Sequence, residues 1–299
     1  MKVLITGGSG FIGSHLAEHY QGKAEVRVLD NLRTGFRKNL DGMDVEFIEG
    51  SICDRALVKE AVQGVDYVFH LAALVSVPES MEKPQECVDI NVNGLLNVLE
   101  ESADAGVKKL CFASSAAVYG DNPLVPKVET MMPEPKSPYA ITKLDGEYYC
   151  GMFQAEERLN TACLRFFNVF GPRQDPDGPY AAAVPIFFQK ALAGETLTIF
   201  GDGSATRDFI YVKDIVAALL HLAGHPDLSG VYNAGYGHCT SIEFLARKIL
   251  QITKSSSEIV HGPERAGDIK HSLASVDKLR NTGFYPSGDL AAGLESLLP

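Results

Sequence analysis

The chain has 299 residues, of which 45% are hydrophobic, so it is long enough to bury a full core in one large domain or in two unequal lobes. Its formal net charge is −11 and it has no run of Lys or Arg, which argues against nucleic-acid binding. The first residues enter a strand at once, and no apolar stretch reaches the roughly 20 residues of a membrane span, so we expect a cytoplasmic protein that does not insert into a membrane.

The first half of the chain alternates short β-rich runs with helical patterns. The predicted strands are residues 2–6, 25–30, 45–50, 66–73, 108–115 and 161–167. The predicted helices are residues 11–20, 54–62, 84–105 and 137–159. This alternation predicts a parallel sheet with crossover helices. The expected fold class is α/β, a Rossmann-like doubly wound parallel sheet with a smaller α/β substrate-binding lobe.

The order of elements becomes less regular after residue 167. A stretch rich in Gly, Pro and Asp, NVFGPRQDPDGPY, is followed by predicted helices over residues 184–193, 212–222 and 241–251, separated by short strands. We therefore expect a Rossmann domain over residues 1–167. Residues 168–299 are expected to form mainly the substrate-binding lobe, with some segments returning to the Rossmann sheet.

Cysteine and histidine usage gives no support for a metal site. The six cysteines show no C-x-x-C pair or regular spacing, and the eight histidines form no H-E-x-x-H or similar set of ligands. We predict reduced, mostly buried thiols and no bound metal.

The opening string TGGSGFIGSH predicts a dinucleotide-binding turn. It offers Gly7, Gly10 and Gly13 directly after a strand and at the start of a helix, where glycine permits close backbone approach and free N–H groups can meet a pyrophosphate. Asp30 ends the next strand and can accept hydrogen bonds from ribose hydroxyls, which favours NAD over NADP. Arg33, in NLRTG, leaves NADP open as the alternative, since an arginine there can accommodate a 2′-phosphate.

Ser115, Tyr139 and Lys143, in SSAAVYG and PYAITK, predict a proton-transfer site beside the nicotinamide ring. A phenol has an ordinary pKa of about 10, so a tyrosine that takes up a proton near neutrality needs a neighbouring cation. Lys143 lies four residues after Tyr139, which in a helix places both side chains on one face. The Ser115 hydroxyl can share the same substrate oxygen.

Motifs along the whole length of the chain resemble those of the extended short-chain dehydrogenase/reductase family, the NAD-dependent epimerases and dehydratases, and specifically the UDP-hexose 4-epimerases. The strings that carry this resemblance are TGGSGFIGSH, LDNLRTG, HLAALVSVPES, INVNGLLNVLE, SSAAVYGD, SPYAITKLDGE, FNVFGPRQDP, FGDGSATRDFIYV and PERAGDIKHS. Several are common to the whole family, and their joint presence in this order is specific.

The resemblance implies an isomerase with NAD in the first lobe and a UDP-sugar in the cleft to the second. The residues that it assigns to the cofactor are Gly7, Gly10, Phe11, Ile12, Asp30, Asn31, Thr34, Gly35, Ser51, Ile52, Leu71, Ala72, Ala73, Tyr139, Lys143 and Phe166. Ser51 departs from the Asp that the family usually places against adenine. Asn91 and Asn97 are expected to bridge to backbone groups and not to contact a ligand.

The residues that the resemblance assigns to the substrate are Ser115, Tyr139, Asn168, Ala182, Ala183, Thr198, Phe200, Arg207, Arg265, Asp268 and Ser272. Among these, Arg207 and Arg265 would hold the diphosphate, because Arg offers bidentate donors to an anion on an acidic protein. The alternative for each arginine is a surface ion pair. Thr198 and Phe200 would enclose the uracil, although apolar residues there could also be core.

The implied mechanism removes the proton of the sugar O4 with Tyr139 while C4 gives a hydride to NAD, and Ser115 relays the proton. The resulting 4-keto sugar turns over and takes the hydride back on its other face. Lys143 would hydrogen-bond the nicotinamide ribose and lower the pKa of Tyr139. Ala116 and Ala117 occupy the two positions where sequences similar to the dehydratases and decarboxylases of the family carry acidic or hydroxyl side chains. Alanine cannot transfer a proton, so the extra catalytic group needed for elimination or decarboxylation is missing at these two positions.

The identity of the sugar stays open between UDP-glucose and UDP-galactose, their N-acetylated counterparts, and UDP-glucuronate. Ser272 occupies a position where some epimerases have a bulky tyrosine, and it leaves room for an N-acetyl group. Val75 occupies another position near the sugar, where relatives with a broader substrate specificity can have glycine, so the sugar pocket is expected to be only partly widened. A glucuronate 4-epimerase would need a further cation, and none is evident. A cofactor-sensing protein without turnover is the alternative from another class. The resemblance also implies a homodimer through the helices of residues 84–105 and 137–159.

Overall fold

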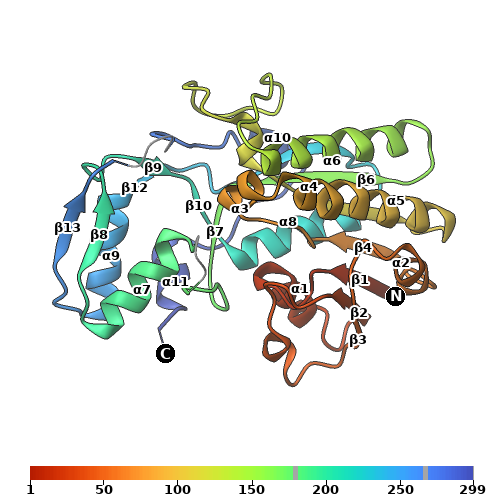
Figure 1. Cartoon of the computed structure of the whole chain (residues 1–299), viewed down its shortest axis with the longest axis horizontal. Coiled ribbons are helices and arrows are strands. Elements are labelled where there is room, and N and C mark those ends of the chain that lie inside the picture. Colours follow the sequence, from red (N-terminus) through yellow and green to blue (C-terminus); the bar gives the residue numbers. More distant parts are fainter. Residues whose placement is uncertain (178–180, 265–268, 299) are drawn as a thin grey trace. The chain divides into compact units, whose positions relative to one another are not determined.

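The computed structural model describes residues 1–177, 181–264 and 269–298 and divides into two compact units (Figure 1). Unit 1 consists of Met1–Gly120, Met132–Phe166 and Val216–Tyr232. Unit 2 consists of Asp121–Met131, Phe167–Ile215 and Asn233–Pro299. The chain therefore passes between the units several times.

The centre of unit 1 is a seven-stranded sheet in the order β11-β6-β5-β4-β1-β2-β3. Its strands are β1 Lys2–Thr6, β2 Glu25–Asp30, β3 Glu46–Glu49, β4 Tyr67–His70, β5 Lys109–Ser115, β6 Thr161–Phe166 and β11 Gly230–Ala234. The five pairings among β1 to β6 are parallel. The strand order reverses between β1 and β4, which is the point where this class of sheet binds its ligands. The predicted Rossmann-like α/β fold is confirmed.

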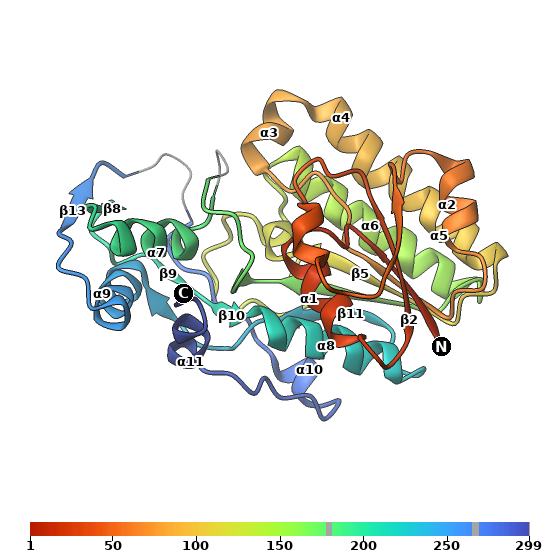
Figure 2. The ribbon, with the colours of Figure 1, turned by 90° about the horizontal axis from the view of Figure 1, so that it is seen from below.

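Helices cover both faces of this sheet. They are α1 Phe11–His19, α2 Arg55–Ala61, α3 Val77–Glu82, α4 Pro84–Val88, α5 Gly94–Asp104, α6 Pro138–Ala155 and α8 Val212–Gly224, with short 3-10 turns η1 Arg37–Leu40 and η3 Ala116–Tyr119. Figure 2 shows α2, α5 and α6 on one face and α1 and α8 on the other. The core on the α2, α5 and α6 face includes Val58, Leu95, Leu99, Phe112 and Phe153, all buried. Burial on both faces explains why the strands are nearly continuous apolar runs.

The long helix predicted for residues 84–105 is interrupted. A π-helical turn, η2 Asp89–Asn93, separates α4 from α5. Within it the buried Asn91 side chain accepts a hydrogen bond from the Leu74 N–H (2.7 Å) and donates to the Leu74 carbonyl (3.0 Å) and to Thr142 Oγ1 (3.0 Å). The turn thus directs a polar side chain inward at a place where an apolar pattern alone predicts an unbroken helix.

Unit 2 is built from small sheets and short helices. Its strands are β7 Asn168–Phe170, β8 Leu197–Phe200, β9 Thr206–Arg207, β10 Phe209–Tyr211, β12 Thr240–Ser241 and β13 Ile259–Gly262. Its helices are α7 Ala183–Ala193, α9 Ile242–Thr253, α10 Asp277–Arg280 and α11 Leu290–Glu295. The pairs β10-β7 and β13-β8 are parallel and β12-β9 is antiparallel. Phe187, Phe188, Leu245 and Ile249 form a core between α7 and α9.

The cysteines are all free, as predicted. Cys87, Cys111, Cys150 and Cys163 are buried, whereas Cys53 and Cys239 are exposed. In the described part of the chain, no helix combines the length and the apolar character needed to cross a membrane.

Candidate active site

The end of strand β5 and the first turns of helix α6 bring the three predicted catalytic residues together in unit 1. Ser137 caps α6 by accepting a hydrogen bond from the Ala140 N–H (3.2 Å), and Pro138 occupies the first helical turn. Tyr139 and Lys143 follow one turn apart on the helix. Ser115 ends β5, and its side chain is near enough to that of Tyr139 to lower the pKa of the phenol. The helix start therefore places the phenol against the strand end.

Lys143 is buried beneath this pair. Its side chain is 4% exposed, and Nζ donates a hydrogen bond to the Ala113 carbonyl (2.8 Å). Nζ also lies 4.9 Å from the centroid of the Phe112 ring and 5.8 Å from that of Tyr139. Burial lowers the pKa of Lys143 to about 8. The ammonium group thus has a fixed position, and burial makes its charged form less favourable than it is in water.

The pKa of Tyr139 differs in direction from the sequence prediction. Tyr139 is half-buried as a whole residue, and the burial of its hydroxyl raises the pKa of Tyr139 above its usual value. The hydrogen bond with Ser115 acts in the opposite direction and favours the phenolate. Among the described residues, no hydrogen bond joins Lys143 to the phenol. Ser115 is the group that lowers the pKa of Tyr139 here, and the lowering of this pKa by Lys143 stays a prediction.

The glycine-rich turn between β1 and α1 has no room for side chains. Gly7 has a φ of 73°, and a Cβ atom on it would lie 2.7 Å from the Ala72 backbone nitrogen. A Cβ atom on Gly13 would lie 2.3 Å from the Gly7 carbonyl oxygen. No side chain caps the start of α1 at Gly10, so the N–H groups of its first turn remain available to an anion. This cradle fits the diphosphate of a dinucleotide.

Asp30, at the end of β2, orders the loop beside this turn. Its two carboxylate oxygens accept hydrogen bonds from the Ser9 and Leu32 N–H groups, each at 2.8 Å. Burial raises the pKa of Asp30, while these two N–H groups lower it. Arg33 is held in ion pairs with Glu79 (2.8 Å) and Glu86. An arginine so paired is not offered to a 2′-phosphate, so the site favours NAD.

The other residues predicted to bind the cofactor follow the carboxyl ends of the same parallel strands. Phe11 and Ile12 begin α1, after β1. The remaining ones stand after β2 (Asn31, Thr34 and Gly35), after β3 (Ser51 and Ile52), after β4 (Leu71, Ala72 and Ala73) and at the end of β6 (Phe166). The carboxyl ends of parallel strands meet at one edge of a sheet, so these residues share that edge with Ser115.

Two polar groups near this edge serve the backbone. The Ser51 hydroxyl accepts a hydrogen bond from the Cys53 N–H (3.1 Å), which closes the turn after β3. Asn97 donates to the carbonyls of Ile52 (3.0 Å) and Cys53 (3.3 Å). Asn97, like Asn91, therefore bridges to the backbone, as the sequence predicted.

Three of the residues predicted to bind the substrate gather in unit 2 around strand β9. Arg207 is on this strand, and the Ser272 N–H donates to the Thr206 carbonyl next to it (3.1 Å). The Asn168 side chain donates to the Asp208 carbonyl (3.2 Å). Arg207 and Ser272 are thus neighbours although 65 positions separate them in the sequence.

Asp208 organises this group and was missed by the sequence analysis. It is fully buried, and its carboxylate accepts hydrogen bonds from the N–H groups of Tyr236 (2.8 Å), Gly237 (3.0 Å) and Ala274 (3.0 Å). Burial raises the pKa of Asp208, and these N–H groups lower it. A charged residue directly before the apolar run FIYV was the available signal.

The remaining predicted substrate residues lie on other parts of unit 2. Thr198 and Phe200 are on β8, whose pairing with β13 places Thr198 opposite Val260. Ala182 is the N-cap of α7 and Ala183 its first residue. Arg265 and Asp268 lie outside the described residues.

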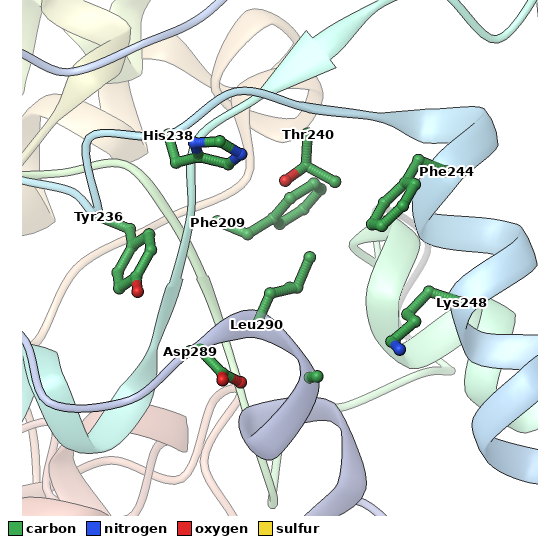
Figure 3. Close-up of a pocket in the computed structure, with 9 residues that line it drawn as sticks. Phe209, Tyr236, His238, Thr240, Phe244, Lys248, Asp289 and Leu290 are labelled. Carbon is green, nitrogen blue, oxygen red and sulfur yellow. The ribbon is translucent and has the colours of Figure 1, made fainter.

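Unit 2 also contains a pocket of about 320 Å³ that the sequence did not predict (Figure 3). It is lined by Phe209, Tyr236, His238, Thr240, Phe244, Lys248, Asp289, Leu290 and Ala291. None of these residues belongs to the predicted catalytic, cofactor or substrate sets.

Comparison with known proteins decides the family. The model of the NAD dependent epimerase/dehydratase family matches residues 3–235. The chain belongs to this family. The resemblance seen in the sequence motifs is thereby confirmed, and the cofactor is NAD, as predicted. The Gly7 to Gly13 cradle and Asp30 are the residues that would hold it.

Relatives of the chain catalyse more than one reaction. The structure of a UDP-N-acetylglucosamine 4-epimerase from Methanobrevibacter ruminantium, solved with UDP-N-acetylmuramic acid, is 39% identical with a TM-score of 0.95 over 99% of this chain and 96% of that one. A UDP-glucose 4-epimerase from Thermus thermophilus, solved with NAD, is 36% identical with a TM-score of 0.90 over 99% and 97%. A UDP-N-acetyl-alpha-D-glucosaminuronate decarboxylase from Bacillus cytotoxicus is 39% identical over 99% of this chain and 96% of its own.

Proposed function

We propose that the protein is a UDP-hexose 4-epimerase that interconverts UDP-glucose and UDP-galactose, and also UDP-GlcNAc and UDP-GalNAc. The observation that carries this proposal is the grouping of Ser115 and Tyr139 with the buried Lys143, whose Nζ lies 5.8 Å from the centroid of the Tyr139 ring, with alanine at the two positions that follow the serine. Ser115 and Tyr139 can move one proton at one oxygen. A reaction that needs a second acid or base has none from Ala116 or Ala117.

In this reaction the protein's own residues move a proton, and NAD, when bound, would supply the hydride chemistry at the sugar C4. Tyr139 takes the proton from the sugar O4, and Ser115 donates a hydrogen bond to the same oxygen. The positive charge of Lys143 beneath the phenol would stabilise Tyr139 as a phenolate while the proton is still on the sugar. Arg207 and Asn168 would hold the diphosphate, so that the keto sugar can turn over while its nucleotide stays bound.

The breadth of substrate rests on Ser272. A serine at this position leaves space beside the sugar for an N-acetyl group, and its backbone is tied to the strand that carries Arg207. Val75, which is 57% exposed, retains some bulk at the other predicted sugar position. The likeness to a UDP-N-acetylglucosamine 4-epimerase supports the wider substrate range.

The test is a panel of single substrates incubated with the purified protein and no added reductant. We expect UDP-galactose to yield UDP-glucose, and UDP-GlcNAc to yield UDP-GalNAc, each to equilibrium. Tyr139→Phe should lower kcat by about 10³-fold or more, within the range seen when a proton-transfer group is removed, and should retain NAD. UDP-glucuronate belongs in the same panel. Release of CO₂ from it, or no conversion of any UDP-hexose by protein that holds NAD, would contradict the proposal.

We also propose that the protein is a homodimer formed through α3, α4 and α6. The exposed apolar side chains on these helices are Val77, Met81, Val88, Ile141, Tyr148 and Met152. Ile141, Tyr148 and Met152 follow one another at spacings of seven and four, which places them on one stripe of α6. α3 and α4 pack against α6, and exposed apolar side chains on helices packed together favour association with a second copy.

A further inference from the structure

A buried ion pair lies next to the catalytic residues of unit 1, and the proposed reaction does not use it. Glu147 and Arg165 are 5% and 4% exposed. The Arg165 guanidinium donates to both carboxylate oxygens, with Nε to Oε1 at 2.8 Å and Nη2 to Oε2 at 2.7 Å. Burying two charges costs solvation energy that their attraction does not always return, so stability alone is a weak explanation for this pair.

The acidic partner connects the helix of Tyr139 to the strand of Ser115. Glu147 stands two turns after Tyr139 on α6, and its Oε1 also accepts a hydrogen bond from Ser114. Ser114 directly precedes Ser115 on β5, and in the sheet it pairs with Arg165 on β6. One carboxylate therefore joins α6, β5 and β6 at the edge where the catalytic groups meet.

The basic partner reaches the other side of Ser115. The Arg165 guanidinium lies 4.8 Å from the centroid of the Tyr119 ring and is hydrogen-bonded to the Tyr119 side chain. Tyr119 is 1% exposed and ends η3, the turn that begins directly after Ser115. The Ser115 hydroxyl accepts from the Ala117 N–H within that turn (3.1 Å). Ser115 is thus held from both sides, upstream through Ser114 and downstream through Tyr119.

We propose that Ser114, Tyr119, Glu147 and Arg165 are positioning residues that hold Ser115 at hydrogen-bonding distance from Tyr139. The proposal rests on the proposed function for the roles of Ser115 and Tyr139. The alternative is that the network stabilises only the fold.

The most direct test removes one hydroxyl without leaving an unpaired charge. In Ser114→Ala the carboxylate keeps both bonds to Arg165, so the protein should fold. We expect kcat to fall about tenfold, with KM changed less than twofold, because the proton-transfer geometry is altered and the binding of the sugar is not. Tyr119→Phe, which loses the second connection, should act in the same direction.

A second readout does not depend on turnover. The chain has 11 tyrosines, and labelling their Cζ atoms with ¹³C lets the ionisation of Tyr139 be followed by NMR, with its signal assigned by its loss in Tyr139→Phe. Since the bond to Ser115 lowers the pKa of Tyr139, a displaced Ser115 should make the Tyr139 signal titrate at higher pH in Ser114→Ala than in the wild type.

The matched control is Ser102→Ala on α5. The Ser102 hydroxyl is also buried, and it has no hydrogen-bond partner among the described residues. This variant should leave kcat and the Tyr139 titration unchanged. An unaltered titration in both Ser114→Ala and Tyr119→Phe would overturn the positioning role. A wild type that converts no UDP-hexose would overturn the proposed function, while a shifted titration in the variants would still support the positioning of Ser115.

Discussion

A single buried residue, His70, is expected to make the free energy of unfolding depend on pH. It ends β4, is 1% exposed, and its Nδ1 lies 2.9 Å from Thr6 Oγ1. Burial, and then the charge of Lys143, lower the pKa of His70 to about 3. The unfolded chain takes up a proton on this residue near pH 6.5 and the folded chain does not, so stability falls as the pH falls from 6.5 towards 3.

We therefore expect His70→Gln to be less sensitive to acid than the wild type. Between pH 7 and pH 4.5 the wild type should lose about 2–3 kcal/mol more free energy of unfolding than the variant, from roughly two pH units of linkage. Urea denaturation at the two pH values measures this difference. His238→Gln, at an exposed position, is the control and should follow the wild type. Equal losses in the wild type and His70→Gln would show that His70 is protonated in the folded state.

The grouping of the three proposed catalytic residues was predictable from sequence, but their electrostatics were not. The four-residue spacing of Tyr139 and Lys143 fixes their common helix face, which depends only on local geometry. The pKa of Tyr139 depends instead on how deeply the hydroxyl is buried and on its bond to Ser115, from a strand 24 positions earlier. Glu147 carried a signal that was overlooked, because it is a charged residue on the face of α6 shared with Lys143.

At the scale of the element, the close approach of α1 to β1 is expected to be a requirement for binding NAD. A Cβ atom on Gly13 would lie 2.3 Å from the Gly7 carbonyl oxygen, so Gly13→Ala must push the helix away from the turn. We expect this variant to lose about 1–3 kcal/mol of stability, as for an overpacked core, and to bind NAD more weakly. Calorimetric titration with NAD and urea denaturation measure the two effects.

Gly151→Ala provides a control for the same chemical change. Gly151 is exposed in the second half of α6, and a Cβ atom there would meet nothing within 4 Å. Alanine should raise the free energy of unfolding by about 0.5–1 kcal/mol, since glycine is the poorer helix former, and leave NAD affinity unchanged. If Gly13→Ala behaved like Gly151→Ala, the close packing of α1 would not be needed for the cofactor.

Most elements followed from periodicity, and the exceptions have physical causes. The alternation of strands and helices up to residue 167 predicted the sheet because each strand and helix carries its own local pattern. The π-helical turn at Asp89–Asn93 was not predictable in this way. In this turn the Asn91 side chain is hydrogen-bonded to the backbone of Leu74, which is 17 positions away in the sequence. Only the folded structure shows that the helix is interrupted there.

At the scale of the whole molecule, the functional residues are divided between the two units in a way that chain order only partly reveals. The residues predicted for the cofactor and for catalysis belong to unit 1, and the described residues predicted only for the substrate, from Asn168 to Ser272, belong to unit 2. Residues 121–131 belong to unit 2, and residues 216–232 belong to unit 1. The two segments are assigned to these units by contacts between residues far apart in the sequence. A domain boundary predicted from local sequence patterns therefore cannot identify them.

The proposed homodimer makes the last prediction, which concerns Tyr148. This residue is 64% exposed at the centre of the apolar stripe on α6. A two-fold axis would bring the same surface of two copies together, so one substitution changes the interface twice. Tyr148→Glu would bury two unpaired carboxylates, and we expect the dimer dissociation constant to rise by about 30-fold or more, as for the loss of an interface hot spot.

Sedimentation velocity over a range of concentrations measures this change. Tyr285→Glu is the matched control, because Tyr285 is 67% exposed and belongs to unit 2, whereas the stripe is on α6 of unit 1. It should remain as dimeric as the wild type. A wild type that is monomeric at tens of micromolar, a range in which specific homodimers are formed, would rule out the proposed dimer. A Tyr148→Glu variant that dimerises normally would show that the interface lies elsewhere. Because α6 also carries Tyr139 and Lys143, loss of the dimer should lower activity together with the stability of that helix.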